Sequence, residues 1–192
     1  MSSDLVLVTG VSGFLAGHVV RDLLGAGYRV RGSVRDARKG DHVRKVLEAH
    51  GADTSGLSFV TLDLMSDAGW QEAMAGVDYL VHTASPFVTH IPKDEAEIIR
   101  PAVEGTRRAL SAALAGGVKR MVVTSSEVAV ARGHGKGLGR PLTEADWSDV
   151  DAPDMTPYFK SKTLAEREAW AIMERAGRRD DLTVVNPGFI LG

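Results

Sequence analysis

The sequence predicts an α/β fold built on a doubly wound parallel sheet. Short apolar runs of strand length alternate along the chain with longer amphipathic segments, the pattern of strands joined by crossover helices. The first apolar run ends in a glycine-containing turn that opens a helical segment. With 192 residues, of which 44% are hydrophobic and 25% are charged, the chain can enclose one substantial core. We therefore expect helices on both faces of the sheet.

The first strand, helix and second strand are predicted within the first 34 residues. Residues 5–8 are an apolar run followed by Thr9 and Gly10, as expected for a buried strand. Residues 14–24 follow as a helix, because their apolar side chains recur near one face and glycines come directly after them. Residues 28–34 form the second strand.

The remaining chain repeats the same alternation. Pro101 lies within a long helical segment and predicts a kink there, because proline has no amide donor. Residues 132–153 are rich in Gly, Pro and Asp and are therefore expected to be a loop. The other expected strands are residues 57–62, 77–82, 118–124 and 182–186, and the other expected helices are residues 41–50, 67–75, 94–115 and 157–176.

Charge and cysteine content exclude several functional classes. The net charge of −2 provides no global attraction to nucleic acid or to an anionic membrane. The absence of cysteine excludes a disulfide framework and a thiolate metal site. The six histidines lack ligand-like spacing, so no metal is expected, and no apolar run approaches the roughly 20 residues of a membrane span. We expect a cytoplasmic domain with a small-molecule partner, and no pattern indicates its oligomeric state.

The turn after the first strand predicts a dinucleotide-binding site. Gly10 permits a tight turn, Gly13 lets the backbone approach a pyrophosphate at the helix N-terminus, and Ala16 permits close packing of helix on strand. The spacing is Gly-x-x-Gly-x-x-Ala rather than Gly-x-Gly-x-x-Gly, and ordinary turn chemistry is the alternative. The cofactor-binding residues expected here are Gly10, Ser12, Gly13, Phe14 and Leu15.

The end of the second strand favours NADP(H) over NAD(H). A carboxylate there binds the ribose hydroxyls of NAD, whereas an arginine receives the 2′-phosphate of NADP. Ser33 and Val34 end the strand without a carboxylate, and Arg35 then offers a guanidinium suited to phosphate. Asp36 is a complication, because an adjacent acid could turn inward instead. The further cations Arg38, Lys39, Arg44 and Lys45 have a solvated basic face as their alternative interpretation.

A tyrosine and a lysine four residues apart are the candidate catalytic pair. Tyr158 and Lys162 project from one helix face. A neighbouring ammonium and an oxidised nicotinamide both favour the phenolate, which would lower the tyrosine pKa from its ordinary value of about 10. Ser125 and Ser126 end the fifth strand, where ligands lie in a doubly wound sheet, and a hydroxyl there can orient a carbonyl. The alternatives are an exposed helical pair and strand-end capping residues.

These motifs, taken in order, resemble the extended short-chain dehydrogenases/reductases, in the branch of dihydroflavonol reductases, cinnamoyl-CoA reductases and yeast methylglyoxal/ketone reductases. The resemblance extends over essentially the whole chain. Its matching segments are residues 8–16, 34–36, 63–64, 82–87, 101–106, 124–126, 158–162 and 186–189. The implied fold is a Rossmann domain, and the implied reaction is NADPH-dependent reduction of an aldehyde or ketone to an alcohol.

The resemblance also implies roles for individual residues. Ser126, Tyr158 and Lys162 would form the catalytic triad, with Ser126 rather than Ser125 as the functional serine. The implied adenine contacts are Asp63 and Leu64, the implied further cofactor contacts are Thr83, Ala84 and Ser85, and the implied nicotinamide contacts are Pro187, Gly188 and Phe189. Lys45 would be a second 2′-phosphate ligand, and the substrate side would include Ser85, Phe87 and Glu127. Glu127 departs from the small or aromatic residue of many relatives.

Two other functions remain open at this point. A nucleotide-sugar epimerase or dehydratase uses the same triad with tightly held NAD, and a non-catalytic NADP-sensing module would share the fold. The C-terminal substrate domain of the resembled family is not in this sequence, which stops after the sixth expected strand. We therefore expect a fragment, residues 1–192 being the NADP-binding domain, with weak NADPH binding and little reductase activity by itself.

Overall fold

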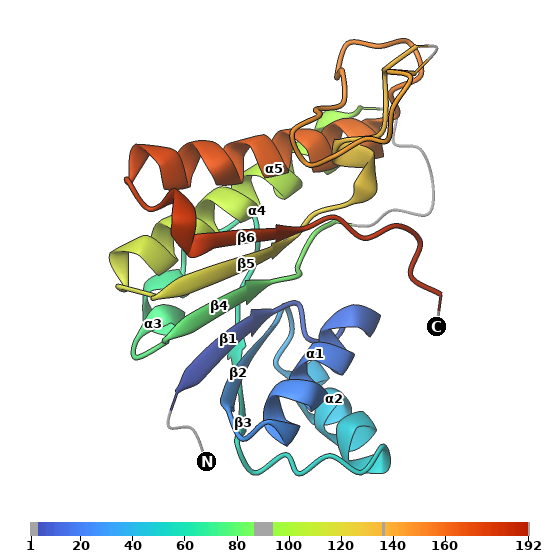
Figure 1. Cartoon of the computed structure of the whole chain (residues 1–192). Helices are drawn as coiled ribbons and strands as arrows, with labels where there is room; N and C mark the ends of the chain where they lie inside the picture. The colour runs from blue at the N-terminus through green and yellow to red at the C-terminus, as the bar shows by residue number, and fades with distance from the viewer. Residues whose placement is uncertain (1–3, 87–93, 136, 192) are drawn as a thin grey trace.

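The computed structural model describes residues 4–86, 94–135 and 137–191, in which six strands form one parallel sheet (Figure 1). The order across the sheet is β3-β2-β1-β4-β5-β6, with parallel pairing between all neighbours. The order reverses beside β1, which confirms the doubly wound arrangement. The strands are β1 (Leu5–Thr9), β2 (Arg29–Val34), β3 (Leu57–Thr61), β4 (Tyr79–His82), β5 (Arg120–Thr124) and β6 (Leu182–Val185).

The helices form two layers, one on each face of the sheet (Figure 1). One layer contains α1 (Phe14–Gly25) and α2 (Arg38–Ala49). The other contains α3 (Trp70–Met74), α4 (Ala96–Ala115) and α5 (Pro157–Arg175). Each layer encloses its own apolar core, because side chains along each strand alternate between the two faces.

Strand β1 shows how the sequence supplies both cores. Leu5 and Leu7 pack with α3, α4 and α5, whereas Val6 and Val8 pack with α1 and α2. All four side chains are buried, since β1 lies at the centre of the sheet. This arrangement explains why the strand is a continuous apolar run rather than an alternating one. It also holds the turn after Thr9 at the carboxyl edge of the sheet, beside the end of β4.

Helices α2 and α3 differ most from their predicted limits, for local reasons. Helix α2 begins at Arg38 because the Asp36 carboxylate accepts the Arg38 amide at 3.0 Å, which satisfies a donor of the first turn. Helix α3 is shorter than predicted, since Gly69 adopts a φ of +83° and delays its start. Pro101 lies inside α4 without ending it. Short 3₁₀ turns at Glu127–Ala129 and Arg179–Asp181 were not predicted.

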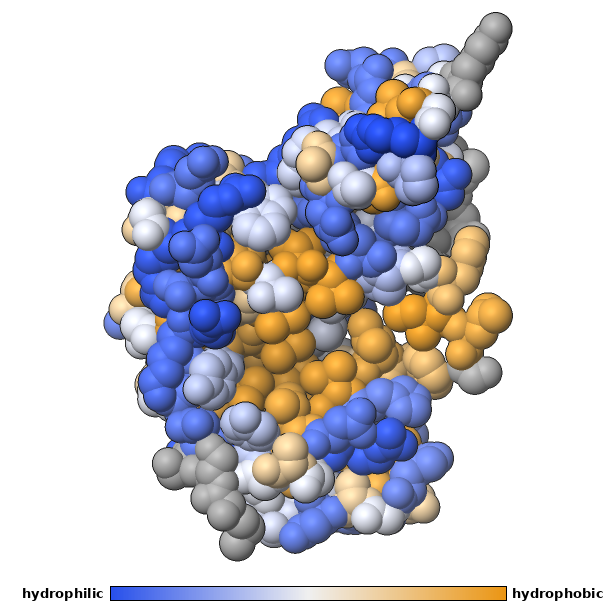
Figure 2. Space-filling model, in the orientation of Figure 1, coloured by the Kyte–Doolittle hydropathy of each residue, from blue (hydrophilic) through white to orange (hydrophobic). Residues whose placement is uncertain are grey.

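The surface is mostly polar, with apolar residues gathered across the middle of the view in Figure 2. The exposed apolar side chains include four near the C-terminus, namely Val185, Phe189, Ile190 and Leu191. Within the part of the chain that the structure describes, the helices lack the length and apolar character needed to cross a bilayer. The same residues contain no group of three or more His, Asp or Glu side chains placed to hold a metal ion.

Candidate active site

The turn between β1 and α1 forms one wall of a groove of about 590 Å³. Gly10 has a φ of +71°, and a Cβ atom there would lie 3.0 Å from both Cα and Cβ of Ala84. Gly13 precedes α1, and no side chain caps the first turn of that helix. The uncapped amide groups favour an anion. The predicted turn residues that line the groove are Gly10, Ser12 and Gly13, together with Thr9.

Arg35 lies at the end of the groove beside β2. It is exposed and lines the groove together with Lys39. Asp36, the predicted competitor, is paired with Arg38, whose Nη2 lies 2.6 Å from Oδ2 of Asp36. Hydrogen bonds from the Arg38 side chain and then its backbone lower the pKa of Asp36, so this carboxylate is ionised and engaged by its own neighbour. Within the described residues, this leaves Arg35 as the guanidinium that faces the groove.

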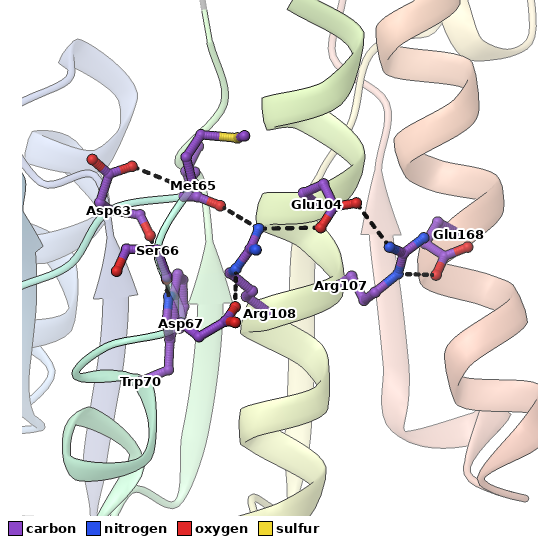
Figure 3. A network of polar contacts seen from close by, with 10 residues as sticks. Asp63, Met65, Ser66, Asp67, Trp70, Glu104, Arg107, Arg108 and Glu168 are labelled. Carbon is purple, nitrogen blue, oxygen red and sulfur yellow. Dashed lines mark hydrogen bonds and ion pairs between the residues drawn. The ribbon is translucent and has the colours of Figure 1, made fainter.

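The turn after β3 forms the opposite wall and is held by Arg108 of α4 (Figure 3). Asp63 and Leu64, the predicted adenine contacts, both line the groove. The Arg108 guanidinium donates to the carbonyl oxygen of Leu64 at 2.9 Å and also pairs with Asp67. A Cβ atom on Gly105 would lie 2.7 Å from Cδ2 of Leu64, so any other residue at that position would displace the Leu64 side chain.

The same ion-pair network continues from α4 to α5, as Figure 3 shows. Glu104 lies 3.3 Å from Arg108 and 3.0 Å from Arg107. Arg107 then pairs with Glu168 of α5 at 2.9 Å. Surface ion pairs of this kind are individually weak, but together they join the turn after β3 to the helix that carries Tyr158.

Beneath the groove, Thr9 joins the ends of β1 and β4. Its hydroxyl oxygen accepts the amides of Thr83 at 3.1 Å and Ala84 at 3.0 Å. Its single proton is then free to be donated to Nδ1 of His82, at 2.9 Å. Burial, with a smaller contribution from the Lys162 charge, lowers the pKa of His82 to about 4. His82 is therefore a neutral core residue with its proton on Nε2.

The three candidate catalytic side chains meet where β5 ends beside α5. Tyr158 is hydrogen-bonded to the side chain of Ser126, and the Lys162 ammonium lies 5.9 Å from the centre of the Tyr158 ring. Burial raises the pKa of Tyr158 above its ordinary value, against the lowering effect of the Ser126 hydrogen bond. Burial also lowers the pKa of Lys162 to about 8. The sequence-based argument expected a neighbouring ammonium and an oxidised nicotinamide to lower the tyrosine pKa, whereas desolvation of the phenol raises it in this structure.

Some of the predicted site residues line the groove, and others lie outside its lining. Thr83, Ala84 and Ser85 line the groove, and Ser85 also lines a small cavity beside Lys162. Lys45 is exposed on α2 and is not part of the groove lining. Pro187 accepts the Glu127 amide at 3.0 Å. The other residues outside the groove lining are Phe14 and Leu15 on α1 and the exposed Gly188 and Phe189, while Phe87 lies outside the described residues.

Glu127, expected on the substrate side, is paired with a residue that the sequence analysis did not single out. Nη2 of Arg132 lies 3.1 Å from Oε1 of Glu127, and the guanidinium stacks 4.8 Å above the Phe159 ring. The negative charge of Glu127 also contributes to the raised pKa of Tyr158. The Glu127 carboxylate is therefore a compensated charge close to the candidate proton donor.

The sequence analysis assigned no role to two further residues, namely Glu166 and Asn186, although Asn186 begins the matching segment 186–189. Glu166 is buried on α5, four residues after Lys162, and Asn186 directly follows β6. The Asn186 side chain donates to Oε2 of Glu166 at 2.7 Å and to the carbonyl oxygen of Ser126 at 3.1 Å. The only sequence signal for Glu166 was its spacing of eight from Tyr158, which places both on one face of α5.

Comparisons with known proteins identify the family of the chain. Residues 6–187 match the model of the NAD dependent epimerase/dehydratase family. A putative NADPH-dependent methylglyoxal reductase of Candida albicans is 34% identical over 203 residues, covering 100% of this chain and 60% of the relative. Cinnamoyl-CoA reductase 1 of Petunia hybrida is 37% identical over 196 residues, covering 100% of this chain and 56% of the relative.

A solved structure is similar over nearly the whole chain. The crystal structure of yeast methylglyoxal/isovaleraldehyde reductase Gre2 complexed with NADPH superposes with a TM-score of 0.81 at 29% identity, covering 98% of this chain and 58% of the other. The chain thus spans about 60% of the length of the curated relatives it matches. The predicted resemblance to extended short-chain reductases is confirmed, and the chain belongs to the NAD dependent epimerase/dehydratase family.

Proposed function

We propose that this chain is the cofactor-binding and catalytic part of an NADPH-dependent reductase of aldehydes or ketones. The observation that carries the proposal is the Ser126–Tyr158 hydrogen bond beside the Lys162 ammonium, at the carboxyl edge of the sheet. Ligands of doubly wound sheets bind at this edge. The relatives support the same reaction class, since they are named as a methylglyoxal reductase and a cinnamoyl-CoA reductase.

The groove fits a dinucleotide with a 2′-phosphate. A Cβ atom at Gly10 would fill the space between the turn and Ala84, and the uncapped first turn of α1 offers amides to a pyrophosphate. Arg35 would bind the 2′-phosphate, with Lys39 beside it and Lys45 as a more distant cation. The remaining cofactor contacts would be Asp63 and Leu64 at the adenine, Thr83, Ala84 and Ser85 along the groove, and Pro187, Gly188 and Phe189 at the nicotinamide.

In the proposed reaction, the bound cofactor supplies a hydride to the carbonyl carbon. Ser126 donates a hydrogen bond to the carbonyl oxygen and holds it against Tyr158. Tyr158 transfers its phenolic proton to that oxygen, which completes the alcohol, and later regains a proton from solvent. With its pKa raised above the ordinary value, Tyr158 carries its phenolic proton at neutral pH. Lys162 would hold the nicotinamide ribose and stabilise the phenolate after the transfer.

Replacement of Tyr158 by phenylalanine tests this assignment. Because the chain spans about 60% of the length of its relatives, the assay uses the protein expressed from its complete reading frame. Oxidation of NADPH would be followed with methylglyoxal and an aliphatic aldehyde. Loss of a general acid costs roughly 100- to 10,000-fold in rate, so Tyr158→Phe should abolish most turnover while NADPH affinity stays within a few-fold.

Tyr79→Phe is the matched control, since Tyr79 lies in β4 against the Tyr28 ring and away from the groove lining. This variant should retain wild-type turnover. Near-normal turnover by Tyr158→Phe would remove Tyr158 as the proton donor. A tightly held NAD recovered with the purified protein, together with no carbonyl reduction, would instead favour an epimerase or dehydratase.

A further inference from the structure

We propose that Asn186 and Glu166 form a tether that positions Ser126 against Tyr158. The proposal rests on the function proposed above, in which Ser126 orients the substrate carbonyl. Both side-chain protons of the Asn186 amide are used, one by Oε2 of Glu166 at 2.7 Å and the other by the Ser126 carbonyl oxygen at 3.1 Å. Asn186 therefore connects the end of β5 to the helix that carries the other two catalytic side chains.

The Glu166 end of the tether is firmly held. Glu166 is only 3% exposed, and its second carboxylate oxygen accepts the indole N–H of Trp170 at 3.3 Å. A buried carboxylate is costly unless its oxygens are hydrogen-bonded, so Glu166 depends on these donors. Tyr158, Lys162 and Glu166 follow one another at intervals of four along α5 and share one helix face. The anchor is thus rigidly connected to the proton donor.

At the other end, the Ser126 carbonyl has two donors that fix its direction. Besides Asn186, the amide of Ala129 donates to it at 3.0 Å. On either side of Ser126 the backbone is bound to the chain around Asn186, since the Ser125 amide donates to the Val185 carbonyl at 2.8 Å and the Glu127 amide donates to the Pro187 carbonyl at 3.0 Å. The carbonyl and the side chain are carried by the same residue, so a tether on the carbonyl restrains the backbone from which the hydroxyl projects. Asn186 is therefore a positioning residue that acts through Ser126.

A double-mutant cycle separates this role from general stabilisation. In the protein expressed from its complete reading frame, Asn186→Ala should lower kcat roughly 10- to 100-fold, because small displacements of a positioning group cost rates of this order. NADPH affinity, measured by fluorescence titration, should stay within about two-fold. In a Ser126→Ala background the same substitution should have almost no further effect, since the serine it positions is gone.

Variants of Glu166 and a control complete the test. Glu166→Gln retains an acceptor for Asn186 and should stay within a few-fold of wild type, whereas Glu166→Met should resemble Asn186→Ala. Glu174→Met, an exposed position on the same helix, should change nothing. Should Asn186→Ala not fold, Asn186→Ser, which cannot span both acceptors, replaces it in the cycle.

Three results would overturn the tether. The first is a loss of kcat in the double variant that equals the product of the two single losses, because this would show that Asn186 and Ser126 act independently. The second is an equal loss of activity in Glu166→Gln and Glu166→Met. The third needs no turnover: hydrogen exchange of the Glu127, Val128 and Ala129 amides should become faster in Asn186→Ala, and unchanged exchange would show that Ser126 is not held by Asn186. Near-normal turnover of Ser126→Ala alone would instead reject the proposed role of the serine.

Discussion

At the end of the groove beside β2, the candidate binding groups are backbone amides and an exposed cation. Gly10 and Gly13 shape the turn, and Arg35 lies at the surface. At the other end of the site, beside β5 and α5 and outside the groove lining, the candidate groups are buried or half-buried side chains, and Glu166 and Asn186 there depend on one another. Removing one of the exposed groups should affect only its own contact with the ligand, because water solvates the groups around it. Removing one of the buried side chains should also disturb its neighbours, since these side chains are hydrogen-bonded to one another.

The largest expected difference lies between two adjacent serines at the buried end. Ser126 is hydrogen-bonded to Tyr158, whereas the Ser125 hydroxyl is buried and without a hydrogen-bond partner among the described residues. Ser126→Ala should slow carbonyl reduction roughly 100-fold, as loss of a donor to a developing oxyanion does. Ser125→Ala should stay within a few-fold, because it removes an unsatisfied group. Steady-state kinetics on both variants would decide, and the reverse order would mean that Ser125 is the functional serine.

The contrast between the two ends also explains what the sequence could predict. The turn with Gly10 and Gly13 was predicted because strand, glycines and helix are contiguous. Tyr158 and Lys162 were predicted because helical spacing places them on one face. The contact of Asn186 with Ser126 spans 60 residues, and no spacing rule relates two such positions. It depends on β5 and β6 being neighbours, which only the assembled sheet reveals.

The direction of the tyrosine pKa could not be predicted for the same reason. The sequence places Lys162 beside Tyr158, and the charge of a lysine alone favours the phenolate. The structure adds burial, which raises the pKa of Tyr158 and lowers that of Lys162 to about 8. At the other end, the sequence left open whether Asp36 competes with Arg35. That question depended on the Arg38 side chain, which engages the Asp36 carboxylate in the folded turn.

An intermediate effect is expected at the exposed end of the groove. Arg35→Ala should weaken NADPH binding roughly ten-fold or more, since a charge-assisted contact contributes about 1.5–3 kcal/mol. NADH binding should stay nearly unchanged, because NADH has no 2′-phosphate. Arg21→Ala removes the same charge from α1, outside the groove lining, and serves as the control. Fluorescence titration with both cofactors is the measurement. Equal losses for NADPH and NADH would show that Arg35 does not bind the 2′-phosphate.

The last expected effect is on stability rather than on rate or binding: at the buried end, the free energy of unfolding should depend on pH through His82. Burial lowers the pKa of His82 to about 4 from its ordinary value of 6.5. Between these pH values the unfolded chain binds a proton that the folded chain does not. The free energy of unfolding should therefore fall as pH falls through this window, by up to about 1.4 kcal/mol per pH unit, and the contribution of His82 should be constant above it.

His82→Asn tests this slope while keeping an acceptor for the Thr9 hydroxyl, which donates to Nδ1 of His82. Urea unfolding at several pH values between about 4.5 and 7 would be followed by tryptophan fluorescence. The variant should lose part of the wild-type dependence on pH, whatever its stability at neutral pH. His42→Asn, on the exposed face of α2, should retain the full slope. The same slope in wild type and in His82→Asn would mean that His82 is protonated in the folded chain, and the buried end would then tolerate charge as the exposed end does.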